Sequence, residues 1–377
     1  MNNLCGKKHH PDPDSPYKRA GSEKGVMYAN GEKESVKRPR VRTTAGEEVK
    51  LEVYEAASDQ NNLFEEVVSC LEAGVSVRSI ERKTNKSVSK SAASRMWGEQ
   101  SRSQLEAFRD RSLQEHDLIS ILIDGVVLAK ETHVIIALGI DIEGNKHALD
   151  FEPGTSESAE TVGRLMERLI KRGVSEPKGR RLLVQRDGSQ AIASAVSKYF
   201  PEAIQQECLV NFQRNLKDRM RKKDHEELDL KFKRLREAEG AEAGEEAWAD
   251  LGEFISERNK LAANAMEERK DKLLAFHRLN VPSTLNRTFL STNIIENAIR
   301  NWRSHTGNIK LWKEKEDMVS RWSATGLLWS ENTFNRIPYA EDLGSLLEAL
   351  TITTPATEAN ASSATEVKAN EELDRTH

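Results

Sequence analysis

Three acidic residues lie next to elements that could deliver their side chains to one point. Asp124 ends an apolar run that begins at Leu118, Asp187 follows a second apolar run at residues 182–184, and Glu296 falls in the expected first turn of a later helix. Carboxylate oxygens are the ligands that hard divalent cations such as Mg²⁺ prefer. Two such ions about 4 Å apart can clamp the attacking and leaving oxygens of a phosphodiester. The trio therefore indicates metal-dependent cleavage or transfer of nucleic-acid strands.

Each acid also has a purely structural explanation. Asp124 precedes Gly125 and could form a turn, and Asp187 could cap the helix that follows Gly188. With Asn293 as the N-cap, Glu296 would occupy the third helical position and close a capping box. No single acid decides between these interpretations, so the catalytic one depends on all three acids occurring in order within one fold.

The composition limits the class of protein. The 377 residues suffice for two or three domains of about 150 residues. A net charge of −4 means that any nucleic-acid surface must be local. Three widely spaced cysteines exclude a disulfide framework and a four-cysteine zinc site, and fit a reducing compartment. The sequence has no run of about 18 apolar residues and no apolar signal core, so we expect a cytoplasmic, nucleoid-associated protein without a membrane span.

Both ends of the chain are expected to be disordered. Residues 1–60 are poor in large apolar groups and rich in charge, so they cannot bury enough surface to offset chain entropy. Residues 346–377 are similarly polar. A basic run in the first segment can contact phosphates or can be a solvated tail, and it comprises Lys37, Arg38, Arg40 and Arg42.

Residues 61–115 show a helical pattern and predict a small helix-turn-helix-like DNA-binding domain. Gly74 ends the first expected helix, and Ser76 and Ser89 can cap the next two. Between residues 78 and 111 there are nine basic and four acidic residues. A solvated basic face is the alternative to a recognition helix that enters a major groove. The predicted DNA-binding residues are Arg78, Arg82, Lys83, Lys86, Lys90, Ser91, Ser94 and Arg95.

The central region predicts an α/β fold with a mixed sheet. Strands are expected at 118–128, 133–141, 146–151, 181–187 and 203–206, and helices at 158–171 and 189–200. This order, with a hairpin at its start, is that of a ribonuclease-H-like core, whereas other three-layer α/β folds place helices between all strands. The first part of this core spans residues 116–211.

Two helical regions follow the first part of the core. Residues 212–285 have the low glycine and proline content of a helical insertion, and residues 286–345 form the C-terminal part of the core. Arg300 and Arg303 follow Glu296 by one and two helical turns and would suit flanking phosphates. A basic cluster opens the insertion and can equally be a solvated face: Arg214, Lys217, Arg219, Arg221, Lys222 and Lys223.

Four stretches of the sequence resemble the Mutator-type transposase family of bacterial insertion sequences. Together with the N-terminal helical region, the resemblance covers roughly residues 62–335. The stretches are DGVVLAK from Asp124, ALGIDIEGNKHALDFEPGTSESAET from Ala137, RDGSQAIASAVSKYFPEAIQQECLVNFQRNL from Arg186, and STNIIENAIRNWR from Ser291.

The resemblance implies a set of roles. Asp124, Asp187 and Glu296 would be a catalytic DDE triad that binds two Mg²⁺ or Mn²⁺ ions, and the N-terminal helical domain would bind element ends. The partner would be double-stranded DNA, both the element ends and the target. Because two ends must be brought together, a homo-oligomer on DNA is expected from this chemistry.

The chain departs from the family pattern at one position. The family usually has Cys-x-x-His after the second Asp, whereas here Cys208 is followed by Asn211, and then by Arg214 and Asn215. Asparagine keeps hydrogen bonding but lacks the imidazole, while Cys208 itself is expected to be a buried small group. Two alternatives to a transposase therefore stay open, namely a ribonuclease-H-like nuclease that does not join strands and a DNA-binding relic that has lost catalysis.

Overall fold

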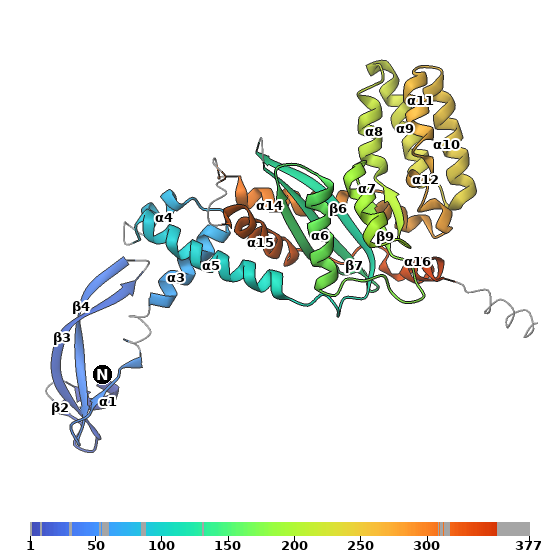
Figure 1. Cartoon of the computed structure of the whole chain (residues 1–377). Coiled ribbons are helices and arrows are strands. Elements are labelled where there is room, and N and C mark those ends of the chain that lie inside the picture. Colours follow the sequence, from blue (N-terminus) through green and yellow to red (C-terminus); the bar gives the residue numbers. More distant parts are fainter. Residues whose placement is uncertain are drawn as a thin grey trace, which may run out of the picture. The chain divides into compact units, whose positions relative to one another are not determined.

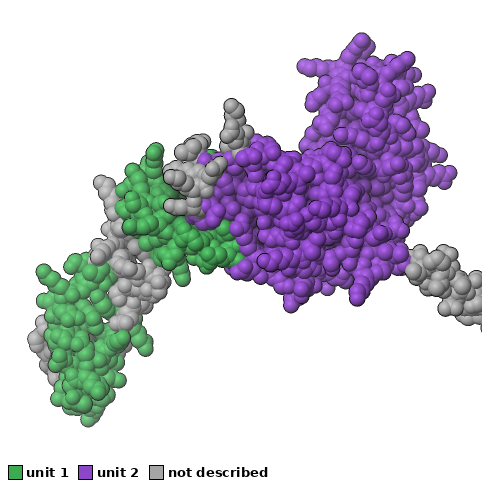
Figure 2. All heavy atoms as spheres, in the orientation of Figure 1, with its two compact units in different colours: residues 1–106, 304–311 green, residues 107–303, 312–377 purple. Residues whose placement is uncertain are grey.

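The computed structural model describes residues 2–7, 10–29, 32–52, 54, 60–83, 88–129, 132–307, 309, 312 and 317–352. The chain divides into two compact units, which Figure 2 colours separately. One comprises residues 1–106 and 304–311, and the other comprises residues 107–303 and 312–377. Within the described residues, no helix is long and apolar enough to cross a membrane.

The first unit begins with short elements, α1 (Asn2–Cys5), β1 (Gly6–Lys7) and β2 (His10–Pro11), and continues with a three-stranded antiparallel sheet. Its strands are β3 (Tyr17–Ala29), β4 (Glu32–Thr43) and β5 (Glu48–Val49). The expectation of disorder is therefore wrong for this segment. Backbone pairing along two long strands and cross-strand ion pairs replace the missing apolar core, since Arg38 lies 3.3 Å from Glu23 and Arg40 lies 2.6 Å from Glu48. Two cations of the basic run thus face carboxylates within the sheet.

Three helices complete the first unit as the sequence predicts, namely α3 (Gln60–Glu72), α4 (Val77–Lys83) and α5 (Lys90–Asp110), the last of which continues into the second unit. Gly74 follows α3 with a positive φ of 80°. The Ser79 backbone N–H donates to the Ser76 hydroxyl at 3.2 Å, and the Ala92 N–H donates to the Ser89 hydroxyl at 3.2 Å. Buried side chains between the helices include Val67, Leu71, Ile80, Ala93 and Trp97.

A five-stranded mixed sheet forms the centre of the second unit. Its strands are β6 (Leu118–Ala129), β7 (Thr132–Asp141), β8 (Lys146–Gly154), β9 (Leu183–Arg186) and β10 (Ile204–Glu207). They lie in the order β10-β9-β6-β7-β8. The first three strands of the chain pair antiparallel, and β9 and β10 run parallel to β6. The predicted mixed α/β architecture is confirmed.

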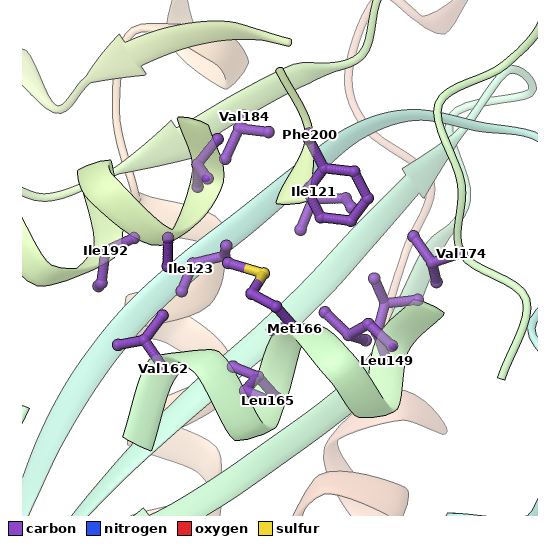
Figure 3. Packing of buried hydrophobic residues seen from close by; sticks show 14 of the residues in the cluster. Ile121, Ile123, Leu149, Val162, Leu165, Met166, Val174, Val184, Ile192 and Phe200 are labelled. Carbon is purple, nitrogen blue, oxygen red and sulfur yellow. The ribbon is translucent and has the colours of Figure 1, made fainter. Parts of the chain in front are cut away.

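Helices cover both faces of this sheet (Figure 1). On one face, α6 (Ala159–Lys171) and α7 (Gln190–Tyr199) pack on Ile121, Ile123 and Val184, with Met166 at the centre of the contact (Figure 3). Successive side chains of a strand point to opposite faces. Asp124 therefore points to the other face, where α14 (Asn293–Thr306) and α15 (Met318–Glu331) lie.

Between β10 and α14 lies a segment that is mainly helical, as expected for residues 212–285. Its helices are α8 (Leu209–Lys217), α9 (His225–Glu237), α10 (Gly240–Ser256), α11 (Lys260–Glu267) and α12 (Lys270–Leu273), joined by the short helix η1 (Lys222–Asp224). Their shared core contains Phe212, Phe232, Trp248, Phe254 and Met266. Short turns then lead back to the sheet: η2 (His277–Leu279), η3 (Ser283–Leu285) and α13 (Asn286–Phe289).

The described chain ends in η5 (Ala340–Asp342) and α16 (Leu343–Leu350). Disorder was expected from residue 346, and this is wrong for residues 346–350. Leu346 and Leu350 have no exposed surface, so α16 is fixed by its apolar face. The rest of the expected tail, residues 353–377, lies outside the described residues.

Candidate active site

Asp124 lies inside strand β6 and does not form a turn. It pairs with Ile136 of β7, and Gly125 pairs with Ile135, so the strand continues through both residues. The Asp124 side chain is only 9% exposed and accepts a hydrogen bond from the Gly125 backbone N–H at 2.8 Å. The turn explanation for this acid is therefore excluded.

Asp187 lies one residue beyond β9, next to Asp124. In the parallel pairing of β6 and β9, Ile123 is opposite Arg186, so the two acids directly follow a paired position on neighbouring strands. An Asp187 carboxylate oxygen accepts from the Ser189 N–H at 2.9 Å. Ser189, and not Asp187, is the N-cap of α7. Asp187 thus stabilises the turn into the helix without capping it.

Glu296 lies in the first turn of α14, as predicted, but it does not close a capping box. Within the described residues its carboxylate is bound to the Arg214 guanidinium, at 3.4 and 3.5 Å, and not to the backbone of Asn293. The Glu296 side chain is 25% exposed. The contact with Arg214 of α8 therefore sets the conformation of the Glu296 side chain. A helix-capping role would not require this contact.

Burial and the charges of two other acids act on the Asp124 carboxyl. Burial raises the pKa of Asp124 to about 7, and the negative charges of Asp187 and Glu296 add to this shift. The hydrogen bond from Gly125 opposes the shift. Burial therefore disfavours ionisation of Asp124 most, and the charges of Asp187 and Glu296 disfavour it further.

The donor chemistry of this acidic centre (Asp124, Asp187 and Glu296) suits a hard divalent cation. All three side chains offer carboxylate oxygens, and a cation would relieve the repulsion that raises the pKa of Asp124. Within the described residues, no group of three or more His, Cys, Asp or Glu side chains is already arranged to hold a metal ion. A site that used all three acids would require Glu296 to leave Arg214.

The Cys208–Asn211 segment ties α8 to the start of α14. Cys208 is the N-cap of α8, and its sulfur accepts from the backbone N–H groups of Asn211 at 3.4 Å and Thr292 at 3.3 Å. Asn211 donates to the Thr292 hydroxyl at 3.4 Å and accepts from Arg214 at 3.0 Å. Asparagine at the unusual position therefore orients the arginine that binds Glu296. Cys208 is 2% exposed, which confirms the expected burial, and Asn215 is exposed.

Two buried glutamines that the sequence analysis did not single out hold the chain between the end of α12 and the start of α14. With its amide oriented to satisfy both neighbours, Gln185 of β9 donates to the backbone oxygens of Thr288 and Ser291 at 2.9 and 3.0 Å. Gln206 of β10 donates to the Leu273 oxygen at 2.9 Å and accepts from the Phe276 N–H at 2.8 Å. The sequence does indicate such residues, because an uncharged polar side chain inside an expected buried strand must find a hydrogen-bond partner.

Glu157 is a further acid near the centre that sequence reasoning missed. It lies in the loop before α6 and forms a hydrogen bond with Ser189, while burial and the charge of Asp187 raise its pKa. A side chain at position 125 would overlap the Glu157 carboxylate, so glycine there keeps room for it. No periodicity in the sequence indicates this contact.

The predicted DNA-binding residues are mostly exposed. On α14, Arg300 is exposed, and Arg303 donates to the backbone oxygen of Val127 at 3.2 Å. Lys90 lies 3.5 Å from Glu81, and Lys86 lies outside the described residues. The remaining positions in α4 and α5 are all exposed: Arg78, Arg82, Lys83, Ser91, Ser94 and Arg95.

The fold and the site define a mixed α/β protein with acidic residues at neighbouring strands of its sheet and a helical segment between β10 and α14. Residues 1–321 match the family described as "Transposase, Mutator family". The chain belongs to the Mutator family of transposases.

Individual relatives agree with this assignment. The chain is 27% identical over 268 residues to the transposase for insertion sequence element IS905 of Lactococcus lactis subsp. lactis (strain IL1403), covering 68% of this chain and 66% of that protein. It is 30% identical over 253 residues to the transposase for ISRM5 of Rhizobium meliloti (strain 1021), covering 63% and 61%. It is 29% identical over 199 residues to the transposase for IS1201 of Lactobacillus helveticus, covering 51% and 52%. The matched region thus spans less than two thirds of each of these relatives.

Proposed function

We propose that this protein cleaves DNA strands at the ends of an insertion sequence and joins the released 3′-hydroxyl to a target strand. The observation that carries the proposal is the placement of Asp124 and Asp187 directly after a paired position of β6 and β9, together with the raised pKa of Asp124, to which the charges of Asp187 and Glu296 contribute. Membership of the Mutator family and the similarity to insertion-sequence transposases support it.

We further propose that the second unit is a ribonuclease-H-like core interrupted by the helical insertion. An antiparallel β6-β7-β8 meander with β9 and β10 parallel to β6 supports this proposal. In this arrangement the two Asp residues come from adjacent strands, and the Glu comes from the helix that follows the insertion. The sheet thus fixes the positions of the two Asp residues. Helix α14 supplies Glu296, which is bound by Arg214 of α8.

In the proposed reaction, each group of the chain has a separate role. Asp124, Asp187 and Glu296 would hold two Mg²⁺ or Mn²⁺ ions, whose chemistry is to activate a water or 3′-hydroxyl and to neutralise charge on the phosphate. Arg214 is the partner of the Glu296 carboxylate in this structure, and Glu296 would leave it to bind a metal ion. Arg300 and Arg303, which follow Glu296 on α14, would bind the phosphates next to the cleaved bond.

We assign recognition of the element ends to α4 and α5. Their exposed basic residues can reach phosphates and base edges, with Arg95 suited to guanine and Lys90 to phosphate. Because one transposition event joins two ends, the acting form would be a homo-oligomer on DNA. These partner assignments follow from the proposed reaction.

A strand-cleavage and joining assay tests the proposed function. Labelled double-stranded element ends are incubated with Mg²⁺ or Mn²⁺ and either the wild type or Asp187→Ala. Metal-dependent nicked and joined products that vanish in the variant are expected. Nicks without joined products would identify a nuclease. Retention of the ends by both proteins with no products from either would identify a DNA-binding protein without catalysis.

A further inference from the structure

A cavity of about 530 Å³ lies in the second unit between α8, α9, α13 and the first residue of α14. Its wall carries three cations, Lys233, Arg236 and Arg287, against one acid, Glu237. Uncharged amide groups complete much of the remaining polar wall, including those of Asn286 and Asn293. A cavity of this size and charge suits an anion with an attached organic group.

Two of the three cations lack a carboxylate partner. Within the described part of the chain, the Arg287 side chain is exposed and forms no hydrogen bond or ion pair. Arg236 is half-buried and donates to the Gln213 side-chain oxygen at 2.5 Å, with no carboxylate within 4 Å among the described residues. Burial lowers the pKa of Arg236, since its guanidinium has lost water without gaining an ion pair. Lys233 lies 3.9 Å from Glu237.

The cavity adjoins the acidic centre through α8 and α14. Val210 and Gln213 line it, and each directly precedes a residue that contacts the α14 region: Asn211 binds Thr292, and Arg214 binds Glu296. Cavity and acidic centre are therefore on neighbouring faces of one helix. On α14, Asn293 lines the cavity about one turn before Glu296, a separation of roughly 5 Å along the helix axis.

We propose that this cavity binds a phosphate of the DNA strand within about three nucleotides of the cleaved bond, with Arg287 and Arg236 as its hydrogen-bond donors. Two guanidinium groups favour phosphate because their planar forks match its oxygens. The proposal rests on the proposed function, since it takes a DNA strand as the occupant. It adds a contact from the helical insertion to the strand that the acidic centre cleaves.

The first test compares salt dependence of DNA binding by the full-length protein. Affinity for labelled double-stranded element ends is measured over a range of KCl concentrations for the wild type, Arg287→Gln and Arg287→Lys. Loss of one phosphate contact should weaken binding about tenfold and reduce the slope of log affinity against log salt by about 0.9, whereas Arg287→Lys should keep the wild-type slope.

Arg234→Gln provides a matched control. Arg234 lies on α9, as Arg236 does, but it does not line the cavity, and its side chain is 74% exposed beside Asp250. It should bind DNA as the wild type does. If Arg287→Gln and Arg234→Gln both match the wild type in affinity and slope, the proposal is overturned.

The second test locates the phosphate. Single phosphates of the strand are replaced by neutral methylphosphonates, and each loss of affinity is compared between the wild type and Arg287→Gln. At one or two positions within about three nucleotides of the cleaved bond, the methylphosphonate should lower the DNA affinity of the wild type but not that of Arg287→Gln. The reason is that the neutral phosphate and the substitution remove the same contact. Equal sensitivity of both proteins at every position would overturn the proposal.

The outcomes separate this proposal from the proposed function. A wild type that binds and cleaves DNA while Arg287→Gln behaves identically would reject only the cavity contact. If the wild type shows a methylphosphonate effect that depends on Arg287 but does not cleave DNA, the phosphate contact is supported and the proposed strand cleavage is rejected. Thermal stabilisation by inorganic phosphate that depends on Arg287, with unchanged DNA binding, would show a free-anion site and overturn the DNA assignment.

Discussion

The acidic centre and the basic face of α4 and α5 differ in how far their charged side chains are exposed to solvent. Asp124 is 9% exposed, and the pKa of its carboxyl is raised to about 7 by burial and by neighbouring acids. Arg78 and Arg95 are exposed, and neither forms a hydrogen bond or ion pair within the described residues. Catalytic carboxylates need fixed positions, whereas a phosphate-binding face needs only accessible charge. We therefore expect substitutions in the acidic centre to affect catalysis and stability, and those on the helices to affect binding.

The largest expected effect is loss of cleavage in Asp187→Asn. This change keeps the shape of the side chain but removes the charge of a proposed metal ligand, so cleavage should fall by at least about 1000-fold. The rate of strand cleavage in Mg²⁺ measures this, with DNA retention as the companion readout. Retention should stay within about twofold of the wild type, because Asp187 is not part of the basic face. Cleavage at a rate near that of the wild type would remove Asp187 from the catalytic residues.

Asp124→Asn should stabilise the metal-free protein at neutral and alkaline pH. The pKa of Asp124 is raised from 3.8 to about 7, so ionisation destabilises the folded state, and this cost grows between pH 4 and pH 7. The variant lacks the charge, so its advantage in free energy of unfolding should increase by about 2.6 kcal/mol between pH 5 and pH 8.

Chemical denaturation in chelator-containing buffers measures this difference. Glu257→Gln offers a control, because Glu257 is an acid on the surface of the insertion whose side chain is 63% exposed. It should show no comparable trend. A pH-independent difference between Asp124→Asn and the wild type would mean that the pKa of Asp124 is not raised in the folded protein.

On the basic face, Arg95→Ala should reduce discrimination between element-end and unrelated DNA about tenfold, the effect of losing one bidentate base contact. Arg102→Ala is the matched control, since Arg102 is also exposed and lies two turns further along α5. It should weaken both DNAs equally. Competition binding at fixed salt gives the ratio. If Arg95→Ala also weakened both DNAs equally, the face would bind phosphate only.

The smallest expected effect comes from Asn211. Asn211→Ala removes the acceptor that orients Arg214, so cleavage should fall about fivefold, corresponding to roughly 1 kcal/mol for one hydrogen bond. Asn211→His should retain more activity than Asn211→Ala, because a ring nitrogen can accept from Arg214. The pH profile of cleavage in all three proteins tests this. Identical profiles and rates would show that Asn211 has no part in positioning Glu296.

Local patterns were sufficient for most secondary structure. The β6–β8 meander, the caps at Ser76 and Ser89, and the three helices after residue 60 follow from alternation, helical periodicity and capping residues, which act within a few positions of the chain. The sheet of residues 17–49 was missed because its strands pair through backbone and ion pairs, which leave little apolar periodicity.

By itself, the sequence determined the order of elements and the three acids, one within an expected strand, one after an expected strand and one in a helix turn. Only the tertiary structure decided how these acids are arranged. Parallel pairing of β6 and β9 places Asp124 beside Asp187, and Gln185, Asn211 and Arg214 fix the helix that carries Glu296. These contacts join residues up to about a hundred positions apart, and a pattern that repeats every two to four residues carries no information about such pairs.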